Sequence, residues 1–426
     1  MAASSSDSKH IKQILAAVIG NALEWYDFIV FGFFAVVLGG LFFPSHDESA
    51  SLMLVFATFG AGFLARPLGG IVLGLVADKK GRKVALQLVI LLMTIAIAII
   101  SFAPTYASIG LAGAFLILLA RLLQGFATGG EFASATAYLV EAAPQGKRGF
   151  YGSLQMSGQC IAAMLATLIG IAVTRHFSQD QINDWAWRLP FIIGLLIGPV
   201  GLYIRKHLNE TESFVSYAKG QQQKSSLMDL IKENKAGVIA SFLATVSATV
   251  YFYIILIYMP TYGKKELGLT LEEAFLAEAS GLVFLIALIP IFGSLSDKYG
   301  RLKFLRFSNI LFLLFTYPLF YMTLQDPSLI KFTVLQIILC IFLSGTLGVF
   351  STLLAEQFKT GSRSTGMAVA YNIAVMTFGG FAPAIVTYLI TSLNTPLAPA
   401  YYVMFGASSG FLASYLLKDK HNSKKI

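Results

Sequence analysis

The stretch GLVADKKGR at residues 74–82 decides the fold, because it recurs as GSLSDKYGR at residues 293–301. Its glycine, aspartate, second glycine and arginine are all displaced by 219 positions. The first copy follows the second long apolar run of the chain, and the second copy follows the eighth. An internal repeat on this scale indicates two related halves, an organisation that is typical of membrane transporters.

A second repeated pair supports the same division of the chain. Glu141 is followed seven positions later by Arg148, and the spacing returns with Glu356 and Arg363, displaced by 215 positions. The first pair follows the fourth apolar run and the second pair follows the tenth. Both halves therefore carry the two motifs in the same order and after equivalent runs.

The composition places the chain in a membrane. Of its 426 residues, 56% are hydrophobic and only 12% are charged, and the mean hydropathy is +0.72. Soluble domains carry about 25% charged residues. Runs long enough to cross a bilayer are expected to be helices, since only helices and closed barrels satisfy the backbone in lipid. Twelve runs lie at about 14–38, 51–76, 84–103, 110–140, 150–174, 188–205, 236–262, 273–295, 304–324, 332–355, 366–391 and 399–417.

We therefore expect an all-α membrane protein with twelve transmembrane helices in two pseudo-symmetric six-helix bundles. The longest polar stretch divides the bundles. The predicted domains are an N-terminal bundle at 1–205, a cytoplasmic linker at 206–235, and a C-terminal bundle with a short cytoplasmic tail at 236–426.

The basic residues predict the orientation. If both termini are cytoplasmic, 24 of the 31 Lys and Arg residues fall in inner segments and five in outer segments. This is the asymmetry of the positive-inside rule. The net charge of +9 then reports topology and argues against a nucleic-acid partner.

The repeated aspartate and arginine predict a latch at the cytoplasmic face. An aspartate at a helix end can accept hydrogen bonds from the free N–H groups of another helix. The arginine can reach a carboxylate such as Glu141 or Glu356. The alternative is a tight turn among positive-inside charges, but two copies in register favour the latch. The predicted gate residues are Asp78, Arg82, Glu141, Arg148, Asp297, Arg301, Glu356 and Arg363.

Carboxylates inside the apolar runs are candidates for proton coupling. No histidine lies within a run, so a coupled proton would be carried by a carboxyl group. Asp27 is the first candidate and Glu24 the second, because both lie in the first run without a basic residue beside them. A structural ion pair or an interhelical hydrogen bond is the alternative. Glu131 lies nearer the cytoplasm and is assigned to coupling, to an inner gate or to a pair with Arg66.

Two arginines inside the runs are candidates for binding a carboxylate substrate. Arg121 is the first candidate, because a planar guanidinium can hold a carboxylate through two hydrogen bonds. The alternative is a proton-relay arginine that pairs with Asp27. Arg66 is a second anion site or a fixed partner of Glu131 or Glu24.

Neutral polar and aromatic side chains are expected to complete the cavity, with ordinary interhelical hydrogen bonding as the alternative for each. The second half is expected to act mainly as a polar and aromatic wall, since Glu278 lies near the outer end of its run. The candidates are Asn21, Tyr26, Gln124, Gln155, Gln159, Tyr251, Tyr258, Tyr371 and Asn372.

These motifs resemble the major facilitator superfamily over essentially the whole chain. The loop at 74–83 and Arg121-x3-Gly125 are similar to its signatures. Finer matches resemble the metabolite:proton symporter branch, whose members carry citrate and tricarballylate, 2-oxoglutarate, shikimate, or proline and betaine. Across the first half the chain is most similar to the citrate and tricarballylate carriers. The finer matches are GNALEWYDF at 20–28, GFLARPLGG at 62–70, RLLQG at 121–125, GGE at 129–131, KRGFY at 147–151 and WRLPF at 187–191.

The resemblance implies uptake driven by the proton gradient across a bacterial cytoplasmic membrane. We expect a monomeric transporter in lipid that imports a small organic anion, a di- or tricarboxylate such as citrate, by alternating access. A zwitterionic osmolyte is the alternative, because Arg121 and Asp27 could each hold one end of it. Only a short polar tail follows Leu417, whereas osmosensing members carry a long coiled coil, and this difference favours the organic anion. A non-transporting receptor or channel is a further alternative. No enzyme activity, cofactor or metal is expected.

Overall fold

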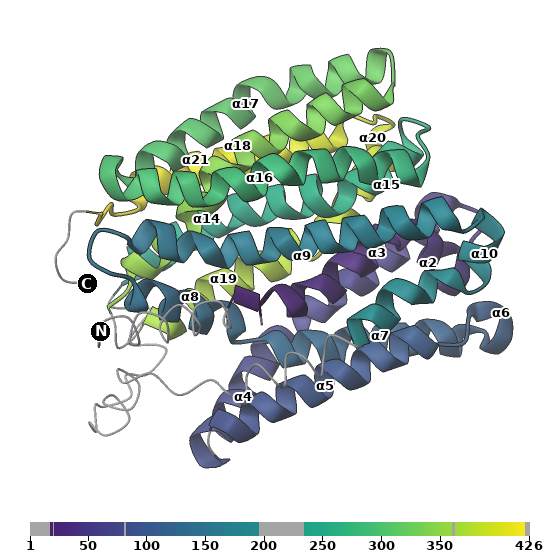
Figure 1. Ribbon diagram of the computed structural model, residues 1–426, viewed down its shortest axis with the longest axis horizontal. Helices are drawn as coiled ribbons and strands as arrows, with labels where there is room; N and C mark the ends of the chain where they lie inside the picture. The colour runs from purple at the N-terminus through teal and green to yellow at the C-terminus, as the bar shows by residue number, and fades with distance from the viewer. Residues whose placement is uncertain (1–17, 20, 81, 196–233, 360–362, 422–426) are drawn as a thin grey trace, which may run out of the picture.

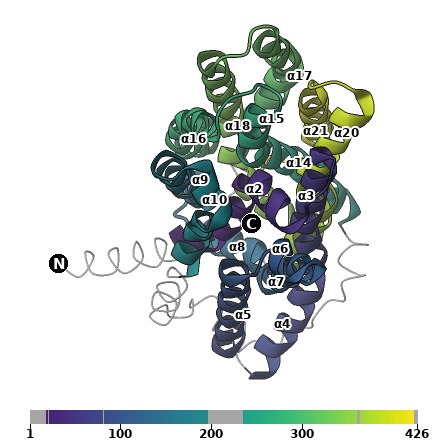
Figure 2. The same cartoon turned by 90° about the vertical axis from the view of Figure 1, so that its right-hand side faces the viewer.

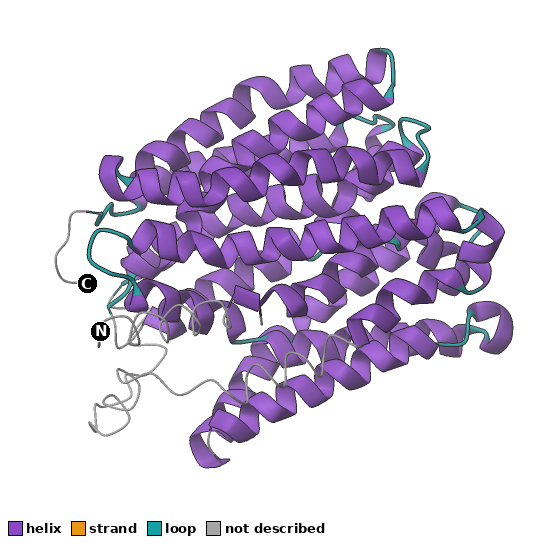
Figure 3. Cartoon of the chain, viewed as in Figure 1, coloured by secondary structure: helices purple, strands orange, loops and turns teal. Residues whose placement is uncertain are grey.

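The computed structural model describes residues 18–19, 21–80, 82–195, 234–359 and 363–421. All regular secondary structure in these ranges is helical (Figure 3). In each of the twelve predicted apolar runs, most of the described residues are helical. The predicted linker lies outside the described residues up to position 233.

The first half is a set of long helices with shorter ones at one end (Figure 1). The helices are Asn21–Phe33, α2 (Ala35–Phe42), α3 (Glu48–Leu64), α4 (Arg66–Lys80), α5 (Arg82–Phe102), α6 (Tyr106–Ile109), α7 (Leu111–Thr128), α8 (Glu131–Ala142), α9 (Arg148–His176), α10 (Gln179–Asp184) and Ala186–Leu195, which begins with the 3₁₀ turn η1 (Ala186–Arg188).

The second half contains two π-helical segments, η2 and η4, within otherwise α-helical spans. Its helices are α14 (Lys235–Tyr251), η2 (Phe252–Tyr258), α15 (Met259–Lys265), α16 (Leu271–Tyr299), α17 (Arg301–Gln325), α18 (Leu329–Gln357), α19 (Arg363–Ala374), η4 (Val375–Gly379), α20 (Ala382–Leu393) and α21 (Ala398–Leu416).

Within the described ranges, eight helices are long and apolar enough to cross a membrane. The count is nine if Asn21–Phe33 and α2, which bend by 65° at Phe34, form one span. Two shorter apolar helices, Gln87–Phe102 and Ala186–Leu195, lie in further predicted runs. The fold is therefore that of a multi-span membrane protein.

Glycines bring helices of the first half into backbone contact. A Cβ atom on Gly125 of α7 would lie 1.6 Å from the carbonyl oxygen of Gly62 in α3. A Cβ atom on Gly69 of α4 would lie 1.8 Å from the carbonyl oxygen of Phe126. Small residues allow this approach between membrane helices, and any side chain at either position would separate them.

The two halves meet along α9 and α16, which run side by side in Figure 1. Viewed end-on in Figure 2, α16, α17 and α18 lie on one side of the molecule and α4, α5 and α7 on the other. We call the end that contains residues 293–301 the latch end. We call the opposite end, where α6 and α10 lie, the plug end (Figure 1).

Candidate functional site

A small cavity lies between the two halves. The first half contributes Trp25, Met156 and Gln159, and the second half contributes residues of α14, η2, α18 and α19. All of its lining residues are buried. The aromatic lining consists of Trp25, Phe252, Tyr253, Phe350 and Tyr371, and the polar lining of Gln159, Thr245 and Thr249.

A second small cavity shares Tyr371 with the first. Arg66, Thr128 and Asn372 supply its polar lining. The guanidinium carbon of Arg66 lies 4.2 Å from the ring centroid of Phe63, and its Nε has no hydrogen-bond partner among the described residues. Arg66 is thus a buried cation at the wall of a small polar cavity.

Arg121 is enclosed by its own half. Its Nη1 donates to Oε1 of Gln124 at 2.7 Å, and its guanidinium carbon lies 3.6 Å from the ring centroid of Phe31. Its Nε and Nη2 have no hydrogen-bond partner in the described part of the chain. Neither Arg121 nor Gln124 lines either cavity. In this conformation the arginine expected to bind substrate is therefore not in contact with the space between the halves.

Asp27 is 3% exposed and lies within electrostatic range of Arg121. Its Oδ1 has no hydrogen-bond partner among the described residues. A Cβ atom on Gly194 would lie 2.1 Å from this oxygen, so glycine at that position leaves the room that the carboxyl group occupies. The neighbouring Tyr26 donates its hydroxyl to the carbonyl oxygen of Pro190 at 2.9 Å. The helix Ala186–Leu195 therefore holds the Asp27 region in place.

Several predicted lining residues are occupied by contacts elsewhere. Asn21 and Gln155 are hydrogen-bonded to each other between the first helix and α9, with Nε2 of Gln155 donating to Oδ1 of Asn21 at 3.1 Å. Tyr251 donates to Oδ1 of Asn309 at 2.7 Å. The Tyr258 hydroxyl lies 3.5 Å from that of Thr387. The six predicted residues that line neither cavity, besides Arg121, are Asn21, Tyr26, Gln124, Gln155, Tyr251 and Tyr258.

The structure brings four predicted residues to the cavities, namely Arg66, Gln159, Tyr371 and Asn372. Nδ2 of Asn372 donates to the carbonyl oxygen of Gly129 at 2.9 Å and so joins α19 to the turn before α8. Glu24 is half-buried in the first helix, and Glu131 is half-buried at the start of α8. Neither glutamate lines a cavity, and their coupling roles stay predictions.

Sequence reasoning missed the face of α14 that lines the cavity. Tyr253 and Thr249 both point polar atoms without hydrogen-bond partners into the interior. The prediction that Tyr251 and Tyr258 line the cavity treats this span as a continuous α-helix, but η2 is a π-helical segment and changes the angle between successive residues. The spacing of Thr245, Thr249 and Phe252, which is i, i+4 and i+7, was the available signal.

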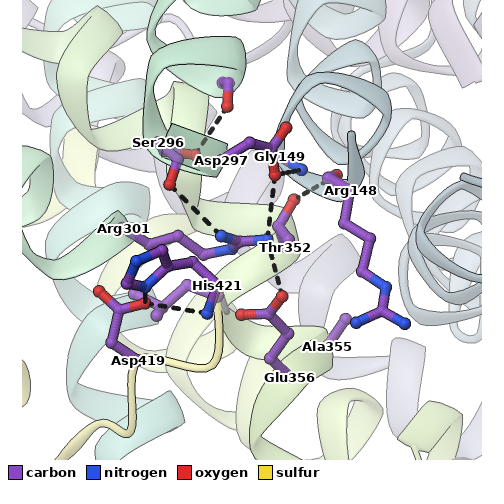
Figure 4. A network of polar contacts seen from close by, with 12 residues as sticks. Arg148, Gly149, Ser296, Asp297, Arg301, Thr352, Ala355, Glu356, Asp419 and His421 are labelled. Atoms are coloured by element: carbon purple, nitrogen blue, oxygen red, sulfur yellow. Dashed lines mark hydrogen bonds and ion pairs between the residues drawn. The ribbon is translucent and has the colours of Figure 1, made fainter. Parts of the chain in front are cut away.

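At the latch end, Asp297 joins the second half to the first (Figure 4). Its Oδ1 accepts the backbone N–H of Gly149 at 2.7 Å, and its Oδ2 accepts that of Phe150 at 3.1 Å. Both N–H groups belong to the first turn of α9, where a helix leaves its donors unsatisfied. An aspartate of the repeated motif thus lies at the start of another helix, as its sequence position predicts.

The arginines at the latch end do not all cross between the halves. Arg301 stays within the second half, with Nη2 at 2.8 Å from Oε1 of Glu356 and 3.3 Å from Asp297 (Figure 4). Arg363 instead crosses to the first half, with Nη1 at 2.6 Å from Oε1 of Glu141. The crossing ion pair therefore comes from the second repeated motif rather than from Arg301.

Two further contacts complete the latch end. Thr352 donates to the carbonyl oxygen of Arg148 at 3.1 Å across the halves. Oδ2 of Asp419 accepts the N–H of Leu302 at 3.0 Å, next to Arg301. Burial acts to raise the pKa of Asp419, but hydrogen bonds from Leu302 and His421 hold it below its usual value. The predicted gate side chains of Asp78 and Arg82 lie outside those that the structure describes.

The plug end is closed mainly by apolar contacts. The ring centroid of Phe275 in α16 lies 5.4 Å from that of Phe33 and 6.1 Å from that of Phe34. A Cβ atom on Gly170 of α9 would lie 2.7 Å from the Phe275 ring. We call this group of rings the aromatic plug. At the rim, Lys265 forms an ion pair with Glu48.

The two cavities therefore lie between the contacts of the latch end and the aromatic plug. Arg66 lies in the wall of the smaller cavity and is suited to bind an anionic group, whereas Arg121 and Asp27 are buried beside each other in the first half, away from both cavities. Within the described ranges, no cluster of His, Cys, Asp or Glu side chains is placed to hold a metal ion.

Comparison with known proteins gives consistent matches. Residues 13–242 match the sugar (and other) transporter family, and residues 275–426 match the Major Facilitator Superfamily. A citrate-proton symporter from Klebsiella pneumoniae is 36% identical over 407 residues, covering 96% of this chain and 91% of the relative. A proline/betaine transporter from Escherichia coli K12 is 32% identical over 426 residues, covering 98% of this chain and 85% of the relative.

Solved structures agree at the level of the fold. The proton:xylose symporter XylE, bound to 6-bromo-6-deoxy-D-glucose, superposes with a TM-score of 0.77 at 17% sequence identity. The match covers 97% of both chains. At this identity the likeness extends to the architecture and not to the solute.

Proposed function

The chain belongs to the major facilitator superfamily, and on that premise we propose that it imports a small organic anion together with protons. The observation that carries the proposal is the pair of small cavities between the halves, with the buried cation Arg66 in the wall of one. It is the only cationic side chain among the residues that line these two cavities. Transport, and not catalysis, is the activity of this superfamily.

Alternating access requires two bodies that rock about the site. We assign six helices to residues 1–205 and six to residues 236–426, joined by a cytoplasmic linker at 206–235. We place the latch end and both termini in the cytoplasm, which the distribution of Lys and Arg supports. The bacterial relatives support a bacterial inner membrane, where the chain would act as a monomer in lipid.

We assign the coupled proton first to Asp27, with Glu24 and Glu131 as further candidates. Asp27 is buried, and Arg121 acts on it electrostatically from the fourth predicted span. An arginine that approaches a buried carboxyl group favours the ionised form, whereas burial favours the neutral form. Movement of Arg121 toward or away from Asp27 would therefore release or retain the proton.

We assign the substrate carboxylate to the cavity of Arg66, where Tyr371 and Asn372 supply neutral polar groups. A guanidinium can hold a carboxylate through two hydrogen bonds. The organic part of the solute would extend past Tyr371 into the larger cavity. The identity of 36% to a citrate-proton symporter supports a citrate-like anion.

A zwitterionic osmolyte is the second candidate, and the lining of the larger cavity favours it. Five aromatic side chains surround this space, and no charged side chain lines it. The face of an aromatic ring attracts quaternary ammonium groups. Betaine would place its ammonium group among these rings and its carboxylate near Arg66, and a proline/betaine transporter is 32% identical.

Uptake into proteoliposomes under an imposed proton gradient tests both candidates. Labelled citrate, proline and betaine are offered in parallel, and we expect uphill accumulation of the true solute that collapses with a protonophore. Binding of the solute without flux would favour a receptor. Solute flux that does not depend on the proton gradient would contradict symport.

Two variants assign the roles. Asp27→Asn should abolish uphill uptake while exchange of solute across the membrane persists. Arg66→Lys should strongly weaken binding of the solute, because a lysine cannot form the bidentate contact with a carboxylate. Lys331→Arg is the matched control, since this side chain lies on the surface of the second half. Unchanged uptake by Asp27→Asn would remove Asp27 from coupling.

A further inference from the structure

A buried carboxyl group without a cationic partner among the described residues lies in the half that was expected to be a neutral wall. Glu278 is 1% exposed, and it lies seven residues beyond Leu271, the first residue of α16. This places it about 10 Å inside the plug end of that helix. Neither cavity is lined by Glu278, and none of the contacts assigned to solute binding or to the latch involves it.

The contacts of Glu278 are with neutral groups. Nε2 of Gln336 in α18 donates to Oε2 of Glu278 and also to the carbonyl oxygen of Ile255, the latter at 2.6 Å. Oε1 of Glu278 has no hydrogen-bond partner in the described part of the chain. Ile255 belongs to η2, the segment that also contributes Phe252 and Tyr253 to the larger cavity.

The titratable groups that face Glu278 are two thiols. Cys160 belongs to α9 of the first half, and Cys340 belongs to α18 of the second. Both thiols are fully buried, and no Lys, Arg or His of the described residues pairs with Glu278. A carboxylate that is removed from water without a cation is strongly disfavoured, so the buried carboxyl group is stable here in its protonated form.

Glu278 also lies near the contact between α9 and α16, which must separate for the plug end to open. Phe275, one helical turn toward the plug end, closes the aromatic plug against Phe33 and Phe34 of the first half. Separation of α9 from α16 at this end would remove the plug and admit water to the next turn of α16. The carboxyl group would then be hydrated, and its ionised form would no longer be disfavoured.

We propose that Glu278 is a proton-binding site that controls closure of the plug end. With the plug open, its carboxylate oxygen takes a proton from a hydronium ion of the outer solution and leaves a water molecule. Closure then buries a neutral carboxyl group, whereas closure over the carboxylate would bury an unpaired charge. The link through Gln336 to Ile255 ties this step to the wall of the larger cavity. The proposal rests on the proposed function as a proton-coupled transporter.

Linkage sets the sign of the pH dependence. The closed state prefers the protonated carboxyl group, so a rise in external pH must shift the population toward the open plug. The ratio of open to closed molecules should rise by up to about tenfold for each pH unit, because one proton is released per opening. The opposite sign would require a closed state that stabilises the carboxylate.

Disulfide trapping across the rim measures closure without any solute. Cysteines replace Glu48 and Lys265, which form an ion pair across the rim in this structure and should separate when the plug end opens. The rate of cross-linking is followed against external pH. The two natural cysteines are buried, and each single-cysteine variant controls for them. We expect cross-linking to fall as pH rises, after correction for thiol reactivity with a chemically equivalent exposed pair.

Three variants of this double-cysteine protein test whether Glu278 causes the pH dependence. Glu278→Gln keeps the shape and a hydrogen-bonding group but cannot titrate, and it should cross-link at a rate that no longer changes with pH beyond thiol reactivity. Glu278→Asp should keep the dependence. Glu272→Gln, on a less buried position of the same helix, should behave as the parent protein.

Two results would overturn the proposal. One is a Glu278→Gln protein whose closure depends on pH as the parent does. The other, decisive also if Glu278→Gln does not fold, is a folded Glu278→Asp protein without pH dependence. The readout needs no substrate, so failure of proton-driven uptake with intact pH-dependent closure would reject the proposed function and leave this proposal standing.

Discussion

The two ends of the molecule are closed by different chemistry. At the latch end, Asp297 accepts two backbone N–H groups of α9, and Arg363 pairs with Glu141. At the plug end, the rings of Phe275, Phe33 and Phe34 pack together, and a single rim ion pair adds to them. The latch end is thus held by polar contacts with fixed geometry, and the plug end by apolar contacts that depend on shape.

The difference shows how one chain can close both ends and still open either. Directional hydrogen bonds are lost abruptly when the helices part by an ångström or two. Apolar rings retain part of their contact as they slide, and closing them is limited by shape and by the charge that closure buries. We therefore expect the latch end to respond to single polar substitutions and the plug end to respond to side-chain volume.

The largest effect should come from added volume at the plug end. Gly170→Leu would place a side chain into the Phe275 ring, which lies 2.7 Å from where a Cβ atom would be. Overpacking typically costs about 1–3 kcal/mol, so closure should be disfavoured by roughly five- to 150-fold. A cysteine at Thr249 in the larger cavity should then react with a membrane-impermeant maleimide from the plug side.

Gly40→Leu provides the control for Gly170→Leu, because a Cβ atom on Gly40 would meet nothing within 4 Å. Uptake should be normal in the control and lost in the plug variant. Equal labelling of both variants would mean that the ring contact does not determine closure.

The next effect should come from Asp297→Ala at the latch end. The substitution removes both hydrogen bonds to the first turn of α9. Hydrogen bonds to a charged group contribute about 1.5–3 kcal/mol, but these two lie partly or fully at the surface, where water replaces most of that contribution, so opening of the latch end should increase by about tenfold. The Thr249 cysteine should become reactive from the latch side in inside-out vesicles.

Asp326→Ala removes an exposed carboxylate at the opposite end of α17 and should leave the labelling unchanged. If Asp297→Ala also leaves the labelling unchanged, the latch contacts form in the closed state but do not stabilise that state.

A smaller effect is expected from the Arg363–Glu141 pair. Glu141 is 31% exposed, so water competes for the contact and reduces its strength. A double-mutant cycle with Arg363→Gln and Glu141→Gln should give a coupling of about 1 kcal/mol in the latch-side labelling equilibrium. Additive effects of the two substitutions would show that the pair does not hold the halves together.

The smallest effect should come from the rim pair at the plug end. Glu48 is 82% exposed, and an ion pair of this kind contributes about 0–1 kcal/mol. Lys265→Gln should change uptake by less than about fivefold, and moderate salt should have a similarly weak effect. A large loss of uptake would place the rim pair among the contacts that close the plug end.

The repeat illustrates how much the sequence alone could predict. The aspartate of residues 293–301 does lie against the start of a helix of the other half, because its distance from the helix end is a local property. The partners of the arginines were less predictable, since Arg301 and Arg363 both lie near more than one carboxylate. Which pair forms depends on how the bundles are positioned, which no spacing encodes.

The candidate site shows the same limit. Periodicity places Asn21 on one face of the first helix with Asp27, but the pairing of Asn21 with Gln155 depends on the distance between that helix and α9. Arg121 was rightly expected inside a span, yet its enclosure by Phe31 and Gln124 keeps it away from the cavities. A helical pattern predicts which side chains share a face of the helix, but it does not predict which other helix packs against that face.

The sequence by itself determined that the chain is a helical membrane protein, that its halves are related, and that ionisable residues lie inside its apolar runs. Hydropathy, repetition and the cost of burying charge are properties of the chain read in one dimension. Only the tertiary structure decided that both ends are closed, that Arg66 rather than Arg121 reaches a cavity, and that Glu278 is buried among neutral groups. These depend on contacts between distant segments, because the environment of a buried group is made by its neighbours in space.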